Sequence, residues 1–584
     1  MKRGMHIMKY LNHIHLHQML DYLKQFGLNN LLNKVPEYLI TSSGYQNWRK
    51  ANTPSPEELK QQSILSQSMK HRPLFSILVP ACNTDLHQLK QMAESVLKQS
   101  YDHWELCIAD GSLKPSKVEE FFEDYMQKHV PEAGTSVNPE AGTSVSPDTT
   151  YPGSVLSFPF GSGHIRFTAI DNLGIAGNTN AALSLASGDY IVLLDHDDLL
   201  SPDALYELAR AINSDPSVDV LYSDEDMVSN DGTFFHNPHF KPDFNPDLLR
   251  SCNYITHLYA VRRSLALLAG GFSGDCDGAQ DYDFILKTTE KAAKICHIPK
   301  VLYHWRIHPG SVAADPNNKS YAYDSAVRAL QRHLVRCDTH ARVKRDINPG
   351  FYTTDYPIPG FPLVSVFLYH CAAPLKRVLM QQRKSRYYTL EFPDSLADAN
   401  GKYILVLRHA AAISADLIQL LLSNCMRSEI GIAIPEIRRP DGKTLEAGLI
   451  YNADGEILSP FSGKDPSYPG YHGYAASQRQ TSLAGPYCFM TDIENLRRNW
   501  SEREPDNAEQ RKQDLYERMT GFCFRTRMDR KLITIDPRAY VRLTKAGISE
   551  AQGIHQIAEQ RYLQECPVDP CYTPNFSQKN LYRF

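Results

Sequence analysis

The sequence lacks several features that define whole classes of proteins. No apolar run approaches the length of a bilayer span, and the N-terminus has no continuous apolar core of the signal-peptide kind. The 12 cysteines are scattered without CxxC spacing, which argues against a disulfide framework and a structural zinc site. A formal net charge of -4 argues against a general nucleic-acid binder. These absences predict a cytoplasmic protein that binds no nucleic acid.

The length of the chain requires more than one hydrophobic core. A chain of 584 residues is expected to form two or three domains. Residues 1–72 have helical spacing, and Ser55-Pro-Glu-Glu58 is typical of a capped helix start. We predict a first α/β domain over 73–345, a second over 346–550 and a C-terminal tail over 551–584.

The segment between Met8 and Leu39 carries apolar residues at helical spacing and scattered Lys and Arg side chains. A basic amphipathic helix of this kind either packs on the protein's own surface or lies on an anionic membrane. Both interpretations stay open, so peripheral association with the inner face of the plasma membrane is one of the alternatives. The oligomeric state is open as well.

Short apolar runs alternate with segments of helical spacing in the first domain. This alternation predicts a mostly parallel, Rossmann-like sheet. Residues 131–146 repeat a polar octapeptide in tandem and predict a mobile insertion at about 129–163. The expected strands are 75–80, 104–110, 165–170, 190–194 and 218–222, and the expected helices are 89–97, 178–186 and 202–212.

Three carboxylates follow the most apolar of these runs. The run Tyr190–Leu194 stops at Asp195-His-Asp-Asp198. If the strand persists, Asp195 and Asp197 leave it on the same side, at the carboxyl end where open α/β sheets bind ligands. Neighbouring carboxylates repel each other unless a cation lies close by. The pattern therefore predicts a site for a metal–nucleotide complex.

The second half repeats the first without its acids. Residues 186–203 align without gaps on residues 399–416, and the strand, the Gly turn before it and the helix start after it are all kept. Asp195, Asp197 and Asp198 are replaced by Arg408, Ala410 and Ala411. We infer two copies of one α/β domain, with the metal chemistry lost in the second.

Seven short motifs follow one another in the first domain: 76–80, 95–101, 105–112, 172–178, 194–198, 279–284 and 297–306. Their order and spacing resemble family 2 glycosyltransferases with the GT-A fold, in particular the tandem rhamnosyltransferase-like group of O-antigen and cell-wall polysaccharide biosynthesis. The likeness is strong over about 73–315 and weak over about 360–545. It implies a catalytic GT-A domain followed by a degenerate GT-A-like domain.

The resemblance also implies which residues bind the nucleotide. Pro80 with the loop after it, together with Asp110, resembles the elements that bind the base, where Asp110 accepts a hydrogen bond from the pyrimidine ring. The alternative role of Asp110 is a strand-end turn at Gly111-Ser112. Asn172 and Gly174 resemble the loop whose backbone approaches the nucleotide, since a glycine has no side chain in the way.

Asp195 and Asp197 resemble the family's metal-binding acidic motif. The resemblance implies that Asp195 faces the ribose or a metal-bound water and that Asp197 ligates Mg²⁺ or Mn²⁺ directly. The metal then stabilises the charge on the leaving nucleoside diphosphate. Asp198 fits a structural acid at the start of a helix.

A catalytic base and a polar–aromatic cluster complete the resemblance. Asp281 resembles the base that deprotonates the acceptor hydroxyl, so that one in-line displacement inverts the anomeric carbon. Asp283 is the alternative base. His304 and Arg306 are expected to contact the diphosphate and His308 to complete the metal shell, with a packing role beneath the site as the alternative.

The sequence therefore predicts an inverting, metal-dependent glycosyltransferase of bacterial surface polysaccharide synthesis. Its donor is a nucleotide sugar such as dTDP-rhamnose or a UDP-sugar, and its acceptor is a saccharide or a lipid-linked glycan. Two other readings stay open: a nucleotidyltransferase, and a non-catalytic carbohydrate-binding or scaffold protein. The first copy's intact acids argue against the scaffold. The absence of Gly or Lys from residues 80–85 argues against the nucleotidyltransferase.

Overall fold

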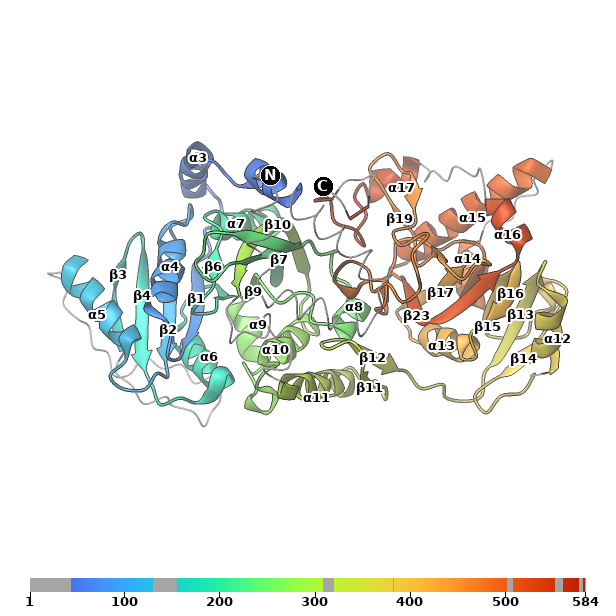
Figure 1. Ribbon diagram of the computed structural model, residues 1–584, viewed down its shortest axis with the longest axis horizontal. Coiled ribbons are helices and arrows are strands. Elements are labelled where there is room, and N and C mark those ends of the chain that lie inside the picture. Colours follow the sequence, from blue (N-terminus) through green and yellow to red (C-terminus); the bar gives the residue numbers. More distant parts are fainter. Residues whose placement is uncertain are drawn as a thin grey trace, which may run out of the picture.

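The computed structural model describes residues 44–129, 155–307, 320–381, 383–500, 508–551, 560–576 and 581–582. Two α/β domains, each built around one large sheet, lie side by side (Figure 1). The α/β class predicted from the sequence is confirmed. The tandem octapeptide and residues 8–39, for which the sequence makes predictions, lie outside the described residues.

One half of the first sheet is parallel and buried on both faces. β1 (Phe75–Ala81) lies between β2 (Trp104–Asp110) and β5 (Tyr190–Leu193), and β4 (Gly163–Ala169) extends the parallel set beyond β2. Alternate residues of β1 face opposite cores, because side chains alternate along a strand. Ile77 packs with the core that includes α4 (Leu86–Leu97) and α7 (Ala204–Ser214), and Leu78 with the core that includes α6 (Gly174–Leu185) and α10 (Gln280–Thr289).

The predicted insertion ends earlier than expected. Residues 155–160 form β3 (Val155–Phe160), an edge strand antiparallel to β4. Phe158 and Phe160 alternate with less buried neighbours and pack into the core, so this stretch has a half-buried strand pattern that the turn residues around it hid. The correction leaves 130–154, outside the described residues, as the remaining candidate insertion.

The other half of the first sheet is mixed. β9 (Tyr259–Arg262) runs antiparallel between β5 and β7 (Val220–Val228), and β10 (Ile295–Arg306) is parallel to β7. β6 (Leu199–Leu200) and β8 (Phe235–His239) complete the edge. The strand expected over 218–222 extends to Val228 as β7, and Asp224, Glu225 and Asp226 are all buried inside it.

The second sheet repeats the strand order of the first. Its order β14-β13-β15-β22-β17-β23-β16 matches β2-β1-β5-β9-β7-β10-β6, with every pair parallel or antiparallel as in the first domain. The strands are β13 (Leu363–Tyr369), β14 (Thr389–Glu391), β15 (Tyr403–Arg408), β16 (Ala410–Ile413), β17 (Ile430–Arg438), β22 (Cys488–Asp492) and β23 (Leu532–Leu543).

The remaining elements pack around these sheets. α3 begins as predicted, with Ser55 as its N-cap and Glu58 completing a capping box. The helices are α3 (Pro56–Gln67), α5 (Lys117–His129), α8 (Pro246–Ser251), α9 (Arg263–Leu268), α11 (Ser320–Arg336), α12 (Ala373–Gln381), α13 (Leu417–Cys425), α14 (Ile493–Asn499), α15 (Ala508–Met528), α16 (Lys545–Ala551) and α17 (Gln560–Glu565), and the minor strands are β11 (Arg342–Arg345), β12 (Tyr352–Asp355), β18 (Thr444–Glu446), β19 (Ile450–Tyr451), β20 (Ile457–Leu458) and β21 (Arg479–Gln480).

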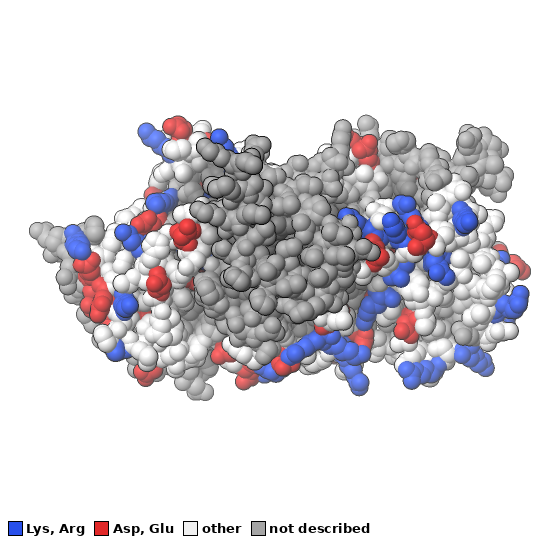
Figure 2. All heavy atoms as spheres, in the orientation of Figure 1, with Lys and Arg blue, Asp and Glu red and all other residues white. Residues whose placement is uncertain are grey.

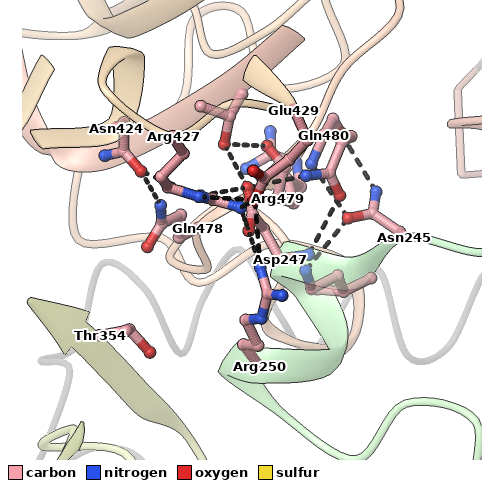
Figure 3. A network of polar contacts seen from close by, with 12 residues as sticks. Asn245, Asp247, Arg250, Thr354, Asn424, Arg427, Glu429, Gln478, Arg479 and Gln480 are labelled. Carbon is pink, nitrogen blue, oxygen red and sulfur yellow. Dashed lines mark hydrogen bonds and ion pairs between the residues drawn. The ribbon is translucent and has the colours of Figure 1, made fainter. Parts of the chain in front are cut away.

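A buried polar network joins α8 of the first domain to the second domain (Figure 3). Asp247, 1% exposed, accepts two hydrogen bonds from the Arg427 guanidinium at 2.6 and 3.1 Å. It also accepts from Gln480 Nε2 at 2.7 Å and from the Thr534 hydroxyl at 2.7 Å. Arg250, one turn along α8, forms a second ion pair with it. A carboxylate with this many donors fixes how the two domains meet.

The two ends of the described chain also reach the domain junction. A helix over 44–52 brings Tyr45 into a small apolar cluster with Phe240 of the first domain, Ile450 of the second, and Tyr572 and Phe576. The predicted C-terminal tail therefore takes part in the packing between domains over its described residues.

Charged side chains are distributed without a dominant sign on the face shown in Figure 2, apart from basic residues gathered near α11 and β11 along its lower edge. Several of these basic residues pair with acids, such as Arg332 with Asp275 and Lys344 with Asp355. Exposed pairs of this kind add little to stability. Within the described residues, no helix combines the length and apolar character that a membrane crossing requires.

Candidate active site

The acids that follow β5 lie in a turn held by β10. β5 ends at Leu193, so the strand alternation does not reach Asp195 and Asp197. The side chain of Asp198 is buried and accepts hydrogen bonds from the Tyr303 hydroxyl at 2.6 Å and from the Arg306 backbone N–H at 2.7 Å. The same hydroxyl accepts from the Asp195 backbone N–H at 3.2 Å. Asp198 does not start a helix, because α7 begins six residues later, and that expectation is corrected.

Electrostatics in this turn favour a cation. Burial raises the pKa of Asp198 well above its ordinary value, and the charges of Asp197 and Asp195 raise it further. Hydrogen bonds from Arg306 and Tyr303 act in the opposite direction without overcoming these effects. Three carboxylates within four residues therefore repel one another, and a divalent ion among them would relieve the repulsion.

Asp195, Asp198 and His257 form a set of metal donors. One ligand atom from each lies within 4.8 Å of the others. Burial lowers the pKa of His257 to about 4, so its ring is neutral at physiological pH and has a lone pair for a metal. The ring stacks on Tyr303, with centroids 4.4 Å apart. Carboxylates suit Mg²⁺ and Mn²⁺, and the added imidazole favours Mn²⁺.

This set differs from the predicted ligands. Asp195 is common to both, Asp198 and His257 were not predicted as ligands, and His308 lies outside the described residues. The role of Asp197 as a ligand stays a prediction. Sequence reasoning missed His257, whose one signal is that it is a polar residue two positions before β9.

Arg306 and His304 are held inside the domain. The Arg306 side chain, 0% exposed, donates from Nε to the Asp197 carbonyl at 2.5 Å and from Nη1 to the Asn230 carbonyl at 2.8 Å. His304 contacts the buried Asp226 through Nδ1 at 2.5 Å, and Tyr45 donates to the other oxygen of that carboxylate. These contacts match the alternative role beneath the site, and contact with a diphosphate stays a prediction for both residues.

The predicted nucleotide loops come together at the carboxyl ends of β1 and β2. Pro80 is the last residue but one of β1 and pairs with Ala109 of β2. The next residue of β2, Asp110, accepts through its carboxylate from the Ser112 N–H at 3.0 Å and from the hydroxyls of Ser112 and Ser116. Asp110 thus has the strand-end turn contacts named as its alternative role. Its contact with a base stays a prediction.

The glycine-containing loop lies beside these strands. The Asn172 side chain accepts a hydrogen bond from the Gly174 N–H at 3.1 Å and donates to Cys82 in the loop after β1. Gly174 has a φ of +75°, and a Cβ there would lie 2.7 Å from Asp277 Oδ2. Only glycine suits this backbone and this approach.

The two candidate bases have different surroundings. Asp281, half-buried in the first turn of α10, accepts a hydrogen bond from the Asn253 side chain at 2.9 Å. Asp283 is buried and forms an ion pair with Lys287 at 3.0 Å. The structure therefore gives Asp283 a structural partner inside the domain, which favours Asp281 as the base. No sequence pattern pointed to Asn253.

Comparison with known families identifies the domain. A sequence model of the family described as "Glycosyl transferase family 2" matches residues 157–266, which run from β3 through the acid turn to α9. The chain therefore carries a glycosyl transferase family 2 domain, as its motifs predict. The matched span includes Asp195, Asp198 and His257.

Curated relatives extend beyond this chain. It is 27% identical over 484 residues to the O-antigen biosynthesis protein RfbC of Myxococcus xanthus, an alignment of 74% of this chain and 35% of that protein. It is 36% identical over 309 residues to the uncharacterized protein y4gI of Sinorhizobium fredii, covering 52% of this chain and 30% of that protein. Escherichia coli chondroitin synthase is 26% identical over 249 residues, covering 43% and 31%. The chain spans about a third of the length of these relatives.

Solved structures that match part of this chain include S. aureus TarS residues 1–349 in complex with UDP-GlcNAc, at 16% identity and a TM-score of 0.30, covering 45% of this chain and 72% of that one. Another is the mannosyltransferase PcManGT from Pyrobaculum calidifontis in complex with GDP-Man and Mn²⁺, at 16% identity and a TM-score of 0.29, covering 48% and 76%.

Proposed function

We propose that this chain is an inverting, metal-dependent glycosyltransferase that moves a sugar from a nucleotide-diphosphate donor to a saccharide or lipid-linked glycan. The observation that carries the proposal is the donor set of Asp195, Asp198 and His257 at the carboxyl end of β5, inside the matched family domain. Relatives named for O-antigen biosynthesis and chondroitin synthesis support a product that is a polysaccharide, and we extend this to bacterial surface polysaccharide.

In this proposal the nucleotide lies along the carboxyl ends of β1 and β2. Asp110 and the loop after Pro80 face the base, while Asn172 and Gly174 let the backbone approach the nucleotide. We propose dTDP-rhamnose or a UDP-sugar as the donor. Bound Mn²⁺ or Mg²⁺ would supply positive charge to the departing diphosphate. Asp195, Asp198 and His257 would hold the ion, with Asp197 as a further candidate in the same turn.

The chemical step is assigned to Asp281. Its carboxylate takes the proton from an acceptor hydroxyl as that oxygen forms a bond to the anomeric carbon. The bond from this carbon to the diphosphate oxygen breaks in the same displacement, and its electrons leave with the nucleoside diphosphate. The Asn253 side chain, which donates to Asp281 at 2.9 Å, orients the carboxylate.

The proposal is tested by product release. Purified protein is incubated with a panel of nucleotide sugars, with EDTA or with Mn²⁺, and free nucleotide is identified by chromatography. We expect nucleoside diphosphate only when Mn²⁺ or Mg²⁺ is present. The variant Asp195→Asn is expected to lose this release, because Asp195 belongs both to the ligands predicted from sequence and to the donor set found in the structure. Asp441→Asn, an exposed acid of the second domain, is the matched control.

Three results would contradict the proposal. Release of pyrophosphate would indicate a nucleotidyltransferase. Equal release of nucleoside diphosphate in the presence of EDTA would contradict the proposed metal dependence. Folded protein that releases no nucleotide from any donor would favour a carbohydrate-binding or scaffold protein.

A further inference from the structure

A cavity of about 190 Å³ lies where the second domain meets the first. It is smaller than the ~300–1,000 Å³ pockets that enclose drug-sized ligands. Both domains and the connection between them contribute to its wall. The residues that matter for its chemistry are Glu225, Asn253, Tyr254 and Trp305 of the first domain, Phe351 of the connection, and His472 of the second domain.

Two residues of this wall each have a buried side-chain oxygen with no hydrogen-bond partner among the residues that the structure describes. Glu225, 6% exposed, uses Oε1 to contact His239 at 3.1 Å and Lys241 at 3.7 Å, while its Oε2 is unpartnered. Asn253 donates through Nδ2 to Asp281, while its Oδ1 is unpartnered. A buried acceptor without a partner costs about 1–3 kcal/mol. Both atoms accept, so a ligand that satisfies them must carry donors such as hydroxyl groups.

Aromatic rings form the rest of the wall. Tyr254, Trp305 and Phe351 present apolar surface to the same cavity as the two acceptors. A ligand that suits this wall has apolar C–H faces and donating hydroxyl edges. A pyranose ring combines these two properties within a small volume.

The second domain builds its side of the cavity with a short glycine-rich segment, Gly470–Tyr474. His472 stacks on His239 of β8 with ring centroids 4.0 Å apart, and its Nε2 contacts the Pro238 carbonyl at 3.1 Å. Tyr474 contacts the other side-chain nitrogen of His239 at 2.8 Å. A Cβ on Gly473 would lie 2.3 Å from Phe351, so glycine allows this close packing. The segment Gly470–Tyr474 therefore packs directly on the first domain.

The cavity adjoins both parts of the proposed site. Asn253 lines the cavity, has one buried unpartnered oxygen, and donates to Asp281 through its side-chain nitrogen. Trp305 packs edge-on against His257, with centroids 5.9 Å apart, and so connects the cavity to the metal donors.

We propose that this interdomain cavity binds one pyranose ring and that the degenerate second domain supplies part of its wall through His472. This rests on the proposed glycosyltransferase function and gives the second domain a role in it. The ring belongs either to the donor or to the end of the acceptor glycan, and kinetics distinguish the two.

The test compares two histidines with the same backbone conformation. His472→Asn alters the cavity wall, whereas His370→Asn alters an exposed residue that stacks on His409 at 5.1 Å, away from the cavity. Both residues have positive φ, 44° and 52°, which Asn tolerates, so the two substitutions place similar demands on the backbone. Binding of methyl pyranosides is measured by saturation-transfer NMR, and KM is measured for donor and for p-nitrophenyl glycoside acceptors.

We expect wild type and His370→Asn to bind at least one methyl pyranoside, and His472→Asn to bind it about tenfold more weakly. A KM increase confined to the acceptor assigns the ring to the acceptor, and one confined to the donor assigns it to the donor. Glu225→Gln replaces a carboxylate oxygen with a donating amide, and we expect it to weaken binding of the same methyl pyranoside.

Unchanged binding and KM in both His472→Asn and Glu225→Gln would overturn the inference while leaving the enzyme assignment intact. Pyranoside binding that depends on His472 in a protein that releases no nucleoside diphosphate would instead overturn the proposed function and retain the cavity as a sugar site.

Discussion

The two domains share a buried hydrogen-bonded chain of glycine, serine and glutamate just before their central strands, β5 and β15. They differ at the carboxyl ends of these strands. In the first domain, the Gly188 N–H donates to Ser76 Oγ at 2.8 Å, and this hydroxyl donates to Glu105 at 2.6 Å. In the second, the Gly401 N–H donates to Ser365 Oγ at 2.9 Å, and that hydroxyl donates to Glu391 at 2.5 Å. This Gly–Ser–Glu chain is therefore part of the fold that both copies share.

The segments that follow the central strands β5 and β15 differ between the two domains. β5 stops at Leu193 and leads into the acid turn, whereas β15 continues to Arg408 and is followed almost at once by β16. Where the first domain has α6 before its central strand, the described part of the second has only a 3₁₀ turn at Leu396–Asp398. The second copy keeps its seven-strand order without the carboxylates, so the fold does not require them. This comparison supports a chemical role, and not a folding role, for the carboxylates in the first copy.

The largest expected effect comes from Asp281, the proposed base. Asp281→Asn is expected to reduce kcat for transfer about 10²–10⁴-fold, because the acceptor hydroxyl loses its proton acceptor. Donor affinity, measured by calorimetry, should change little. Asp283→Asn is the control, and it should affect stability more than kcat since Asp283 pairs with Lys287. The reverse pattern would make Asp283 the base.

Next in size is the effect on metal binding, which sharpens the contrast between Asp198 and Ala411. Asp198→Asn is expected to weaken Mn²⁺ binding at least ~10–100-fold, the range seen when even outer partners of metal ligands are removed. Mn²⁺ affinity is read from the EPR signal of the free ion. Asp197→Asn, in the same turn but outside the donor set, serves as the matched variant. A larger loss in Asp197→Asn would restore the ligand predicted from sequence.

A third prediction concerns the contact between the copies. Asp247→Ala leaves the Arg427 guanidinium buried without its main partner, and such a loss costs about 3–5 kcal/mol. Urea unfolding followed by tryptophan fluorescence should show lower stability, with the two domains unfolding in separate steps. Asp355→Ala, which breaks the less buried pairs with Lys344 and Arg538, should cost much less. Equal costs would mean that the buried network does not hold the domains together.

The smallest expected effect is the pH dependence of this contact. Burial acts to raise the pKa of Asp247, but Arg427 and Arg250 outweigh it and hold the pKa below its ordinary value. Its contribution to stability is therefore complete above the unfolded pKa of about 3.9 and is lost as pH falls through the folded pKa. Unfolding free energy measured between pH 6 and 3 should fall less steeply for Asp247→Asn than for wild type. Parallel curves would exclude Asp247 as the source.

The sequence by itself determined the elements whose signals are local. The run Trp104–Asp110 is β2 at the residues expected, because a continuous apolar run can be buried on both faces of a sheet. Ser55 caps α3, because its hydroxyl and Glu58 satisfy the first N–H groups within four residues of chain. The internal repeat was visible in the sequence for the same reason, since the strand, the glycine turn before it and the helix start after it each have a local pattern in both copies.

Tertiary structure decided everything that depends on partners distant in the chain. The strand expected over 218–222 continues through Asp224 and Asp226, because Lys241, His304 and Asn575 contact these two carboxylates inside β7. His257 joins the acids of residues 195–198 only because β9 runs antiparallel beside β5. The cavity between the domains likewise needs both copies in contact. Burial of a charge or an unpartnered oxygen is set by what surrounds it in space, and a linear pattern does not contain that information.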